Sequence, residues 1–330
     1  MKKILDKLIA GGILSFQEAF DAMVGMAQGK YPVAQVASFL TIFEMRRITV
    51  GELNAFRTAF LELGKKPNVG TQNAIDSCGT GGDRKNTFNI STLSSFIVAG
   101  AGYPVVKHGA GSASGSFGSS DIMTAVGYKL TDNEDVLKKQ LEETNFCYLH
   151  SPFYYGFMKN IAPIRKDLGI QNFFNMIGPL MNPVQPKFQL VGVYSLNVAE
   201  LYYQILCEER DNFTIVHSSD VFDEISLTAD FHAITRDEAD LIEPESIGFN
   251  RISPRRLLCA DTPQGKVKQF LDILDNKGTT EQTDVVIVNA AAAINTISGQ
   301  NDFHKAVDEA RESLVSGKAK TVLEKLKTYL

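Results

Sequence analysis

Hydrophobic residues near the start of the chain recur at helical spacing. The apolar residues that follow Pro32 lie three or four positions apart on one predicted helix face: Val33, Val36, Ala37, Leu40 and Phe43. A helix with one apolar face must pack that face against other helices or a sheet. A small helical domain is therefore predicted at residues 1–66.

Capping residues mark the ends of two other helices in this domain. Segments 15–18 and 49–52 both read Ser/Thr-x-x-Glu, a pattern whose first and last side chains bond the free N–H groups of a helix N-terminus. Gly29 and Gly64 stand at the far ends of the two apolar runs, where glycine often ends a helix. The polar, turn-rich segment 65–70 is the predicted linker.

The pattern changes after the linker to short apolar runs alternating with helical segments. Four of these runs predict strands: 105–106, 189–193, 213–216 and 285–288. Residues 96–101 predict a helix. Such alternation is typical of an α/β domain with a central, partly parallel sheet, expected here over 70–330. Helices within about 155–185 are candidates to join the helical domain.

Composition narrows the class of protein. The 330 residues are 44% hydrophobic, which is enough for a large core and a second, smaller domain. The net charge of −5 provides no basic surface for nucleic acid or an anionic membrane. Four widely spaced cysteines form no Cys-x-x-Cys pair, which favours a reducing cytoplasm. No apolar run approaches the ~20 residues that span a bilayer.

A glycine-rich segment holds the densest group of candidate binding residues. Gly79, Gly81, Gly82 and Asp83 precede hydroxyl and amide side chains and a helix predicted to start near Leu93. Glycine leaves backbone N–H groups open to close approach, and a helix N-terminus favours anions. The spacing matches neither a Rossmann dinucleotide site nor a P-loop. The segment therefore predicts a site for a different phosphorylated ligand.

Polar residues also follow two of the predicted strands. Lys107 and His108 follow the strand at 105–106, and segment 217–220 follows the strand at 213–216. Ligands of α/β sheets gather beyond the carboxyl ends of strands, so both groups are expected to face one crevice. An ammonium at this place is suited to phosphate oxygens, although an isolated lysine or histidine is more often a structural or surface residue.

Five segments together carry a resemblance to a known family: 79–83, 86–92, 107–109, 174–183 and 223–228. They occur in the order seen in the anthranilate phosphoribosyltransferase family, and the chain resembles that family over nearly its whole length. That family joins anthranilate to phosphoribosyl pyrophosphate (PRPP) with magnesium, in tryptophan biosynthesis. The resemblance implies a helical domain and a larger α/β domain similar to the type II nucleoside phosphorylases. It also implies a homodimer formed through the helical domain.

The resemblance implies roles for individual residues. PRPP is expected to bind Gly79, Gly81, Gly82, Asp83, Thr87, Asn89, Ile90, Ser91, Thr92, Lys107 and Ser119. Two Mg²⁺ ions are expected at Ser91, Asp223 and Glu224. The acceptor is expected to contact Gly79, His108 and Arg165, with the arginine fork on its carboxylate. No single general base is expected, because pyrophosphate leaves as a magnesium complex and the protein contributes position and electrostatics.

The acceptor half departs from the family pattern. The family usually continues Lys-His-Gly with Asn-Arg, but this chain has Ala110 and Gly111; Tyr155, Gly156 and Phe157 replace the usual His-Pro-Ala. An enzyme for another aromatic amine is therefore an alternative, with a pyrimidine nucleoside phosphorylase more distant. A catalytically silent homologue that binds nucleic acid is a third, although the retained carboxylate pair and the net charge argue against it.

Overall fold

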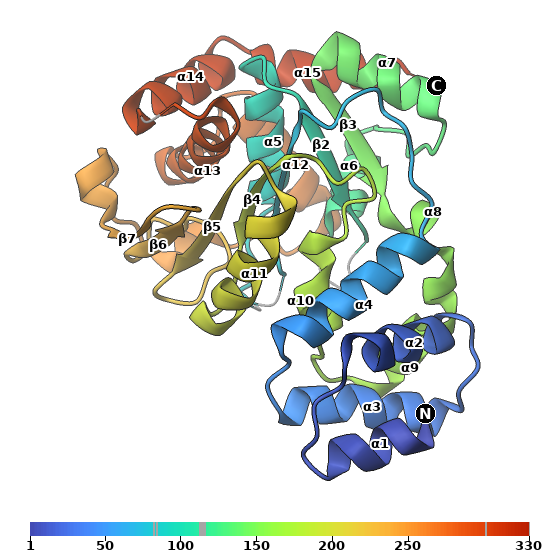
Figure 1. Ribbon diagram of the computed structural model, residues 1–330. Coiled ribbons are helices and arrows are strands. Elements are labelled where there is room, and N and C mark those ends of the chain that lie inside the picture. Colours follow the sequence, from blue (N-terminus) through green and yellow to red (C-terminus); the bar gives the residue numbers. More distant parts are fainter. Residues whose placement is uncertain (82, 84, 112–116, 301, 330) are drawn as a thin grey trace. The chain divides into compact units, whose positions relative to one another are not determined.

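The chain forms two compact units, and the computed structural model describes residues 1–81, 83, 85–111, 117–300 and 302–329 (Figure 1). The helical unit comprises Met1–Lys66 and Ser151–Pro183, and the α/β unit comprises Pro67–His150 and Val184–Leu330. Among the described residues, no helix is both long and apolar enough to cross a bilayer.

Four N-terminal helices and a group of shorter ones build the helical unit. They are α1 Lys2–Ile9, α2 Phe16–Ala27, α3 Val33–Met45, α4 Val50–Leu63, α8 Ser151–Tyr154, η1 Gly156–Asn160, α9 Ala162–Leu168, α10 Phe174–Ile177 and η2 Gly178–Leu180. Both predicted capping boxes are present, with Ser15 and Thr49 each accepting the N–H of the glutamate three residues on. The predicted start of each helix is therefore confirmed.

The predicted apolar face of α3 is only partly buried. Val36, Leu40 and Phe43 are buried, whereas Val33 is 62% exposed. Phe43 belongs to an aromatic core in which the Phe173 ring stacks on Phe56 at 4.5 Å between centroids. Each such ring pair adds about 0.5–1.5 kcal/mol beyond the burial of its area. This core joins the segment that contains α8–α10 to the N-terminal helices.

A seven-stranded sheet forms the centre of the described α/β unit, with the order β3-β2-β1-β4-β5-β6-β7. The strands are β1 Ile75–Gly79, β2 Val105–Gly109, β3 Phe146–His150, β4 Phe188–Gly192, β5 Asn212–Ser218, β6 Phe231–Ile234 and β7 Ala239–Ile242. The four pairs among β3, β2, β1, β4 and β5 are parallel, and the β5–β6 and β6–β7 pairs are antiparallel. The predicted central, partly parallel sheet is confirmed.

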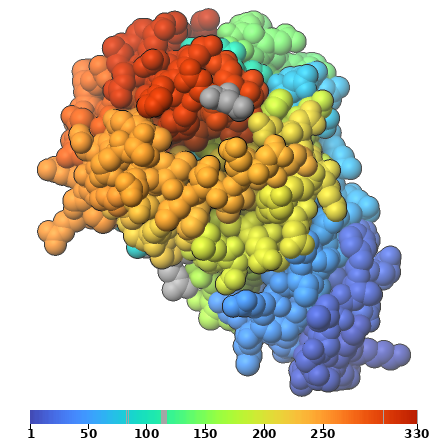
Figure 2. Space-filling model, turned by 60° about the vertical axis from the view of Figure 1, so that its left-hand side comes forward, coloured from blue at the N-terminus to red at the C-terminus, as the bar shows by residue number. Residues whose placement is uncertain are grey.

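Helices cover this sheet and complete its core. They are α5 Ile90–Gly100, α6 Ser119–Ala125, α7 Glu134–Thr144, α11 Leu196–Glu209, α12 Pro263–Leu274, α13 Thr280–Ser298, α14 Phe303–Val315 and α15 Lys318–Leu326, with η3 Pro244–Ile247 and η4 Pro254–Leu257. Helix α13 packs against α5, β4 and β5. In Figure 2 the segment after β7, in orange, lies beside the C-terminal helices, in red.

Three predicted strands lie where β2, β4 and β5 form, and the helix predicted at 96–101 lies in α5 apart from its last residue. The strand predicted at 285–288 is wrong, because these residues lie inside α13. Four consecutive apolar residues fit a buried helix as well as a buried strand. The alanines that follow, and a capping box between Thr279 and Gln282, favour the helix.

Candidate active site

The glycine-rich segment connects the carboxyl end of β1 to α5. Gly81 has φ +67°, in the left-handed region that glycine adopts without steric cost. Helix α5 begins at Ile90, three residues earlier than Leu93, so Ser91 lies in its first turn. The start of a helix leaves backbone N–H groups without partners inside the helix, and such groups favour a nearby anion. Gly82 lies outside the described residues.

The loop that carries Asp223 and Glu224 lies against the glycine-rich segment. Thr80 Oγ1 donates a hydrogen bond of 2.8 Å to Asp223 Oδ2, and the Gly81 N–H donates to the same oxygen. A Cβ added to Gly192, at the end of β4, would collide with the Asp223 carbonyl oxygen. Glycine at this strand end is therefore what allows the carboxylate loop to lie across the sheet.

Burial raises the pKa of both carboxyl groups. The pKa of Asp223 is raised to about 7 by burial and then by the negative charge of Asp83. The pKa of Glu224 is raised to about 8 by burial and then by the charge of Asp223, while a hydrogen bond from the Ser91 backbone acts in the opposite direction. A cation bound beside the two groups would favour their ionised forms and lower both pKa values.

The donor set fits a hard divalent cation. Besides the two carboxyl groups, Asp83 Oδ2 is buried and has no hydrogen-bond partner in the described structure. Within the described residues, no cluster of three or more His, Cys, Asp or Glu side chains is arranged to hold an ion by itself. Mg²⁺ commonly binds one or two protein carboxylates and completes its shell with water and substrate phosphates, so it suits this site.

Lys107 lies within β2 rather than after it, and its side chain is only 1% exposed. Its Nζ donates to the Ser77 carbonyl oxygen and to Ser91 Oγ, the latter at 3.3 Å. Its positive charge lowers the pKa of Glu224, which partly offsets the effect of burial. The ammonium group is therefore held between β1 and the first turn of α5, near enough to Glu224 for its charge to act on that carboxyl.

His108 is held by a buried carboxylate that the sequence analysis missed. His108 Nδ1 lies 2.7 Å from Asp76 Oδ2, and both residues are buried. A carboxylate at this distance accepts a hydrogen bond from Nδ1–H and so orients the imidazole ring. One feature of the sequence could have indicated this pair. Asp76 directly follows Ile75 at the start of β1, and a charged side chain that is buried needs a partner.

The remaining predicted PRPP ligands surround the same strand ends. Ser119 Oγ lies 2.8 Å from the Tyr148 hydroxyl, beside Gly109, where an added Cβ would collide with that Oγ. Asn89 Nδ2 donates to the Phe117 carbonyl oxygen at 3.2 Å.

Two threonines of the predicted set differ in their surroundings. Thr92 Oγ1 is buried and has no hydrogen-bond partner in the described structure. Thr87 forms an isolated β-bridge with Leu258, so the segment after β7 supports the loop that enters α5. Thr87 therefore helps to hold the loop before α5, whereas the Thr92 hydroxyl inside the first turn makes no such contact among the described residues.

Arg165 belongs to the helical unit, in α9, whereas the residues described above belong to the α/β unit. Its guanidinium carbon lies 4.7 Å from the centre of the Phe174 ring. Burial lowers its pKa to about 10, and its Nε is buried with no hydrogen-bond partner in the described structure. A half-buried guanidinium with an unused donor is suited to a planar anion.

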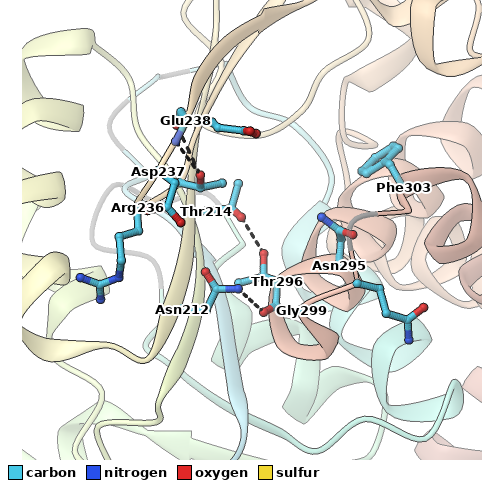
Figure 3. Close-up of a pocket in the computed structure, with 11 residues that line it drawn as sticks. Asn212, Thr214, Arg236, Asp237, Glu238, Asn295, Thr296, Gly299 and Phe303 are labelled. Atoms are coloured by element: carbon cyan, nitrogen blue, oxygen red, sulfur yellow. Dashed lines mark hydrogen bonds between the residues drawn. The ribbon is translucent and has the colours of Figure 1, made fainter.

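A separate hollow of about 430 Å³ lies at the amino end of β5 (Figure 3). Asn212 and Thr214 line it from β5 and bond to Thr296 of α13, and Arg236 is at its border. The candidate phosphate and cation ligands that the structure describes gather at the opposite, carboxyl ends of the strands. Ligands of parallel sheets bind at that carboxyl end, so this hollow is not the candidate active site.

We predict that a divalent cation stabilises the protein more at about pH 8.5 than at about pH 6. In the unfolded chain the two carboxyls ionise near 3.8 and 4.5, whereas in the folded protein they retain protons to about pH 7 and 8. The stability of the ion-free protein therefore falls as pH rises from about 4 to about 8. A bound cation favours the ionised forms and offsets this loss.

Thermal unfolding with and without Mg²⁺, across this pH range, measures the difference. The control is the double variant Asp223→Asn/Glu224→Gln, in which the pH dependence of the Mg²⁺ effect should disappear. An equal Mg²⁺ effect at both ends of the range in the unmodified protein would contradict the prediction.

Two family models match the chain. "Glycosyl transferase family, helical bundle domain" matches residues 2–64, and "Glycosyl transferase family, a/b domain" matches residues 71–320.

Two curated relatives are similar to the chain over almost all of their length. The anthranilate phosphoribosyltransferase of Bacteroides fragilis is 46% identical, over 98% of this chain and 98% of the relative. That of Flavobacterium psychrophilum is 44% identical, over 99% and 98%.

Solved structures share the fold. The crystal structure of anthranilate phosphoribosyltransferase from Thermus thermophilus has a TM-score of 0.91 with 27% identity, covering 98% of each chain. The Saccharomyces cerevisiae enzyme in complex with PRPP and Mg also has a TM-score of 0.91, with 24% identity, over 99% of this chain and 97% of the other.

Proposed function

Because this chain belongs to the anthranilate phosphoribosyltransferase family, we propose that it transfers the phosphoribosyl group of PRPP to anthranilate and releases pyrophosphate, in tryptophan biosynthesis. The family that the five sequence segments indicated is thereby confirmed. The relatives favour this transferase over an enzyme for another amine and over a silent nucleic-acid-binding homologue. The cytoplasm is the proposed location.

One observation carries the proposal: a lysine, a helix N-terminus and two carboxyl groups, that of the buried Asp223 and that of the half-buried Glu224, meet at the carboxyl ends of the strands. Lys107 Nζ bonds Ser91 Oγ, and the Ser91 backbone bonds Glu224. The cationic groups suit phosphate oxygens, and the carboxyls suit Mg²⁺ bound to pyrophosphate. A site that held only one of these groups would not match a ligand with a phosphate and a metal-bound pyrophosphate.

The proposed reaction needs little acid–base chemistry from the protein. The bond between the anomeric carbon and the pyrophosphate oxygen breaks, the aryl nitrogen forms a bond to that carbon, and the amine loses a proton. Two Mg²⁺ ions, at Asp223 and Glu224 and at Ser91, would stabilise the charge of the departing pyrophosphate. The protein residues hold PRPP in place, with Lys107 and the α5 N-terminus at its phosphate groups.

The proposal is tested by pyrophosphate release from PRPP in the presence of anthranilate, other aromatic amines and nucleobases. We expect release that depends on both Mg²⁺ and anthranilate. Release with another aromatic amine but not with anthranilate, even at high concentration, would replace the proposed acceptor. This panel is chosen because Ala110 stands where the family usually has an asparagine.

Arg165→Ala is expected to raise the anthranilate KM by roughly ten- to a hundredfold, because one charge-assisted contact to the acceptor carboxylate is lost. Affinity for PRPP should barely change. Steady-state kinetics with each substrate varied in turn measure the two effects. Lys166→Ala, which removes the neighbouring charge on the same helix, is the matched control. An unchanged anthranilate KM in Arg165→Ala would remove the arginine from the acceptor site.

We predict a homodimer that forms through the helical unit. Large hydrophobic side chains are exposed on this unit: Ile9, Ile13, Phe16, Val33 and Met45. Several such residues on a small unit indicate a surface that a partner covers. Sedimentation velocity should show a dimer, and Val33→Glu with Met45→Glu should shift it toward monomer. A monomer at every concentration of the unmodified protein would contradict the prediction.

A further inference from the structure

The segment between β5 and β6 contains two strained residues on either side of the carboxylate pair. Val221 has φ +77° and Leu227 has φ +58°, in the left-handed region that residues with a Cβ rarely adopt. Each such residue costs on the order of 1–3 kcal/mol and persists only where surrounding contacts enforce it. Something must therefore hold the backbone between these two positions.

The side chain of Asn289, on α13, provides that contact. The Ile225 N–H donates to Asn289 Oδ1 at 3.0 Å, and Asn289 Nδ2 donates to the Ile225 carbonyl oxygen at 2.8 Å. Both polar groups of the residue directly after Glu224 are thus bonded to one amide. Asn289 Nδ2 also donates to the Val285 carbonyl oxygen at 2.8 Å, which fixes the amide on its own helix.

Asn289 is buried, so its amide does not simply interact with solvent. Its side chain is 1% exposed and stands in the longest buried apolar run of α13, from Val285 to Ile294. A buried amide without partners costs several kcal/mol, whereas a fully bonded one specifies a single arrangement. An amide both donates and accepts, so it can pair with a whole peptide group. An ionised aspartate cannot donate and would add another negative charge beside the carboxylate pair.

A serine holds the same loop from the sheet side. Ser218 Oγ, at the end of β5, donates to the Glu224 carbonyl oxygen at 2.8 Å and accepts from the Ser226 N–H at 3.3 Å. The backbone on both sides of Ile225 is therefore bonded to buried side chains from two elements, α13 and β5. The two side chains fix the direction in which Glu224 leaves the backbone.

We propose that Asn289 is a positioning residue for the cation site. By bonding the Ile225 peptide group, it holds the strained loop in the conformation that presents Asp223 and Glu224 together, and Ser218 supports the same conformation. This inference rests on the proposed function only for the identity of the ion and the substrate. The geometry of the loop is independent of both.

Cation binding tests the proposal without using activity. Mn²⁺ serves as the probe and is titrated by electron paramagnetic resonance, alone and then with PRPP. We expect Asn289→Ala to weaken Mn²⁺ binding by roughly ten- to a hundredfold, the usual effect of removing a contact that orients a metal ligand. Ser218→Ala should weaken it in the same direction and keeps the test available if Asn289→Ala fails to fold.

Thr296→Val is the matched control. Thr296 lies on the same helix, is 2% exposed and bonds to Thr214 of β5, at the other end of that strand. We expect this variant to lower the melting temperature but to leave Mn²⁺ affinity unchanged. Unchanged Mn²⁺ affinity in both Asn289→Ala and Ser218→Ala, or an equal loss in Thr296→Val, would overturn the proposal.

The outcome separates this inference from the proposed function. If the unmodified protein binds Mn²⁺ but transfers no phosphoribosyl group to anthranilate, the proposed function fails, and the variants still test the positioning role. If the unmodified protein binds no Mn²⁺ with or without PRPP, the positioning role is overturned together with the cation site.

Discussion

The double variant Asp223→Asn/Glu224→Gln is expected to lose all measurable turnover while keeping its fold. Both substitutions preserve shape, and Asp223→Asn leaves an amide oxygen that can accept from Thr80 and Gly81, but together they remove the two negative charges that would bind Mg²⁺. Without a bound cation the pyrophosphate leaves far more slowly, so the loss should exceed about a hundredfold. Pyrophosphate release at limiting and saturating Mg²⁺ measures it.

Stability distinguishes a lost metal site from a damaged fold. Because burial raises the pKa of both carboxyls, the neutral double variant should be at least as stable as the ion-free parent at about pH 8.5. Asp275→Asn/Glu312→Gln removes the same charge outside this site, at one half-buried and one exposed position, and should retain activity. Near-normal activity of the Asp223→Asn/Glu224→Gln protein at limiting Mg²⁺ would falsify the metal assignment.

The second large effect is expected on replacing Lys107, which should weaken the binding of PRPP more than the binding of the acceptor. The ammonium is buried and bonds Ser91 at the start of α5, where the phosphate groups are proposed to lie. Losing a charge-assisted hydrogen bond costs ~1.5–3 kcal/mol, or roughly ten- to more than a hundredfold in affinity. Lys107→Ala should therefore weaken PRPP binding by this factor in calorimetric titrations with Mg²⁺.

Lys107→Met separates charge from packing, because methionine fills most of the lysine volume without a charge. It should weaken PRPP binding as strongly as the alanine variant while unfolding at a higher temperature. Lys187→Ala, which removes an exposed lysine paired with Asp211, is the control for a general change in charge. PRPP affinity equal to that of the parent in Lys107→Met would exclude an electrostatic role for this lysine.

Local signals in the sequence predicted much of the helical unit and of the sheet. The capping boxes at Ser15 and Thr49 depend only on residues three positions apart, so they could be read directly and are confirmed. The runs that became β2, β4 and β5 were found because buried parallel strands are continuously apolar. The same reasoning failed at 285–288, since a helix buried on every side has the same appearance.

The ordered motifs in the sequence also determined the family, and with it the expected phosphate and cation ligands, because those residues cluster in short, glycine-rich segments. Tertiary structure alone decided which buried polar groups complete the site. Asp76 meets His108 across two strands, and Asn289 reaches Ile225 from a helix 64 positions away. Neither pair has a sequence signature, because a buried side chain is satisfied by whichever backbone or charge the fold brings beside it.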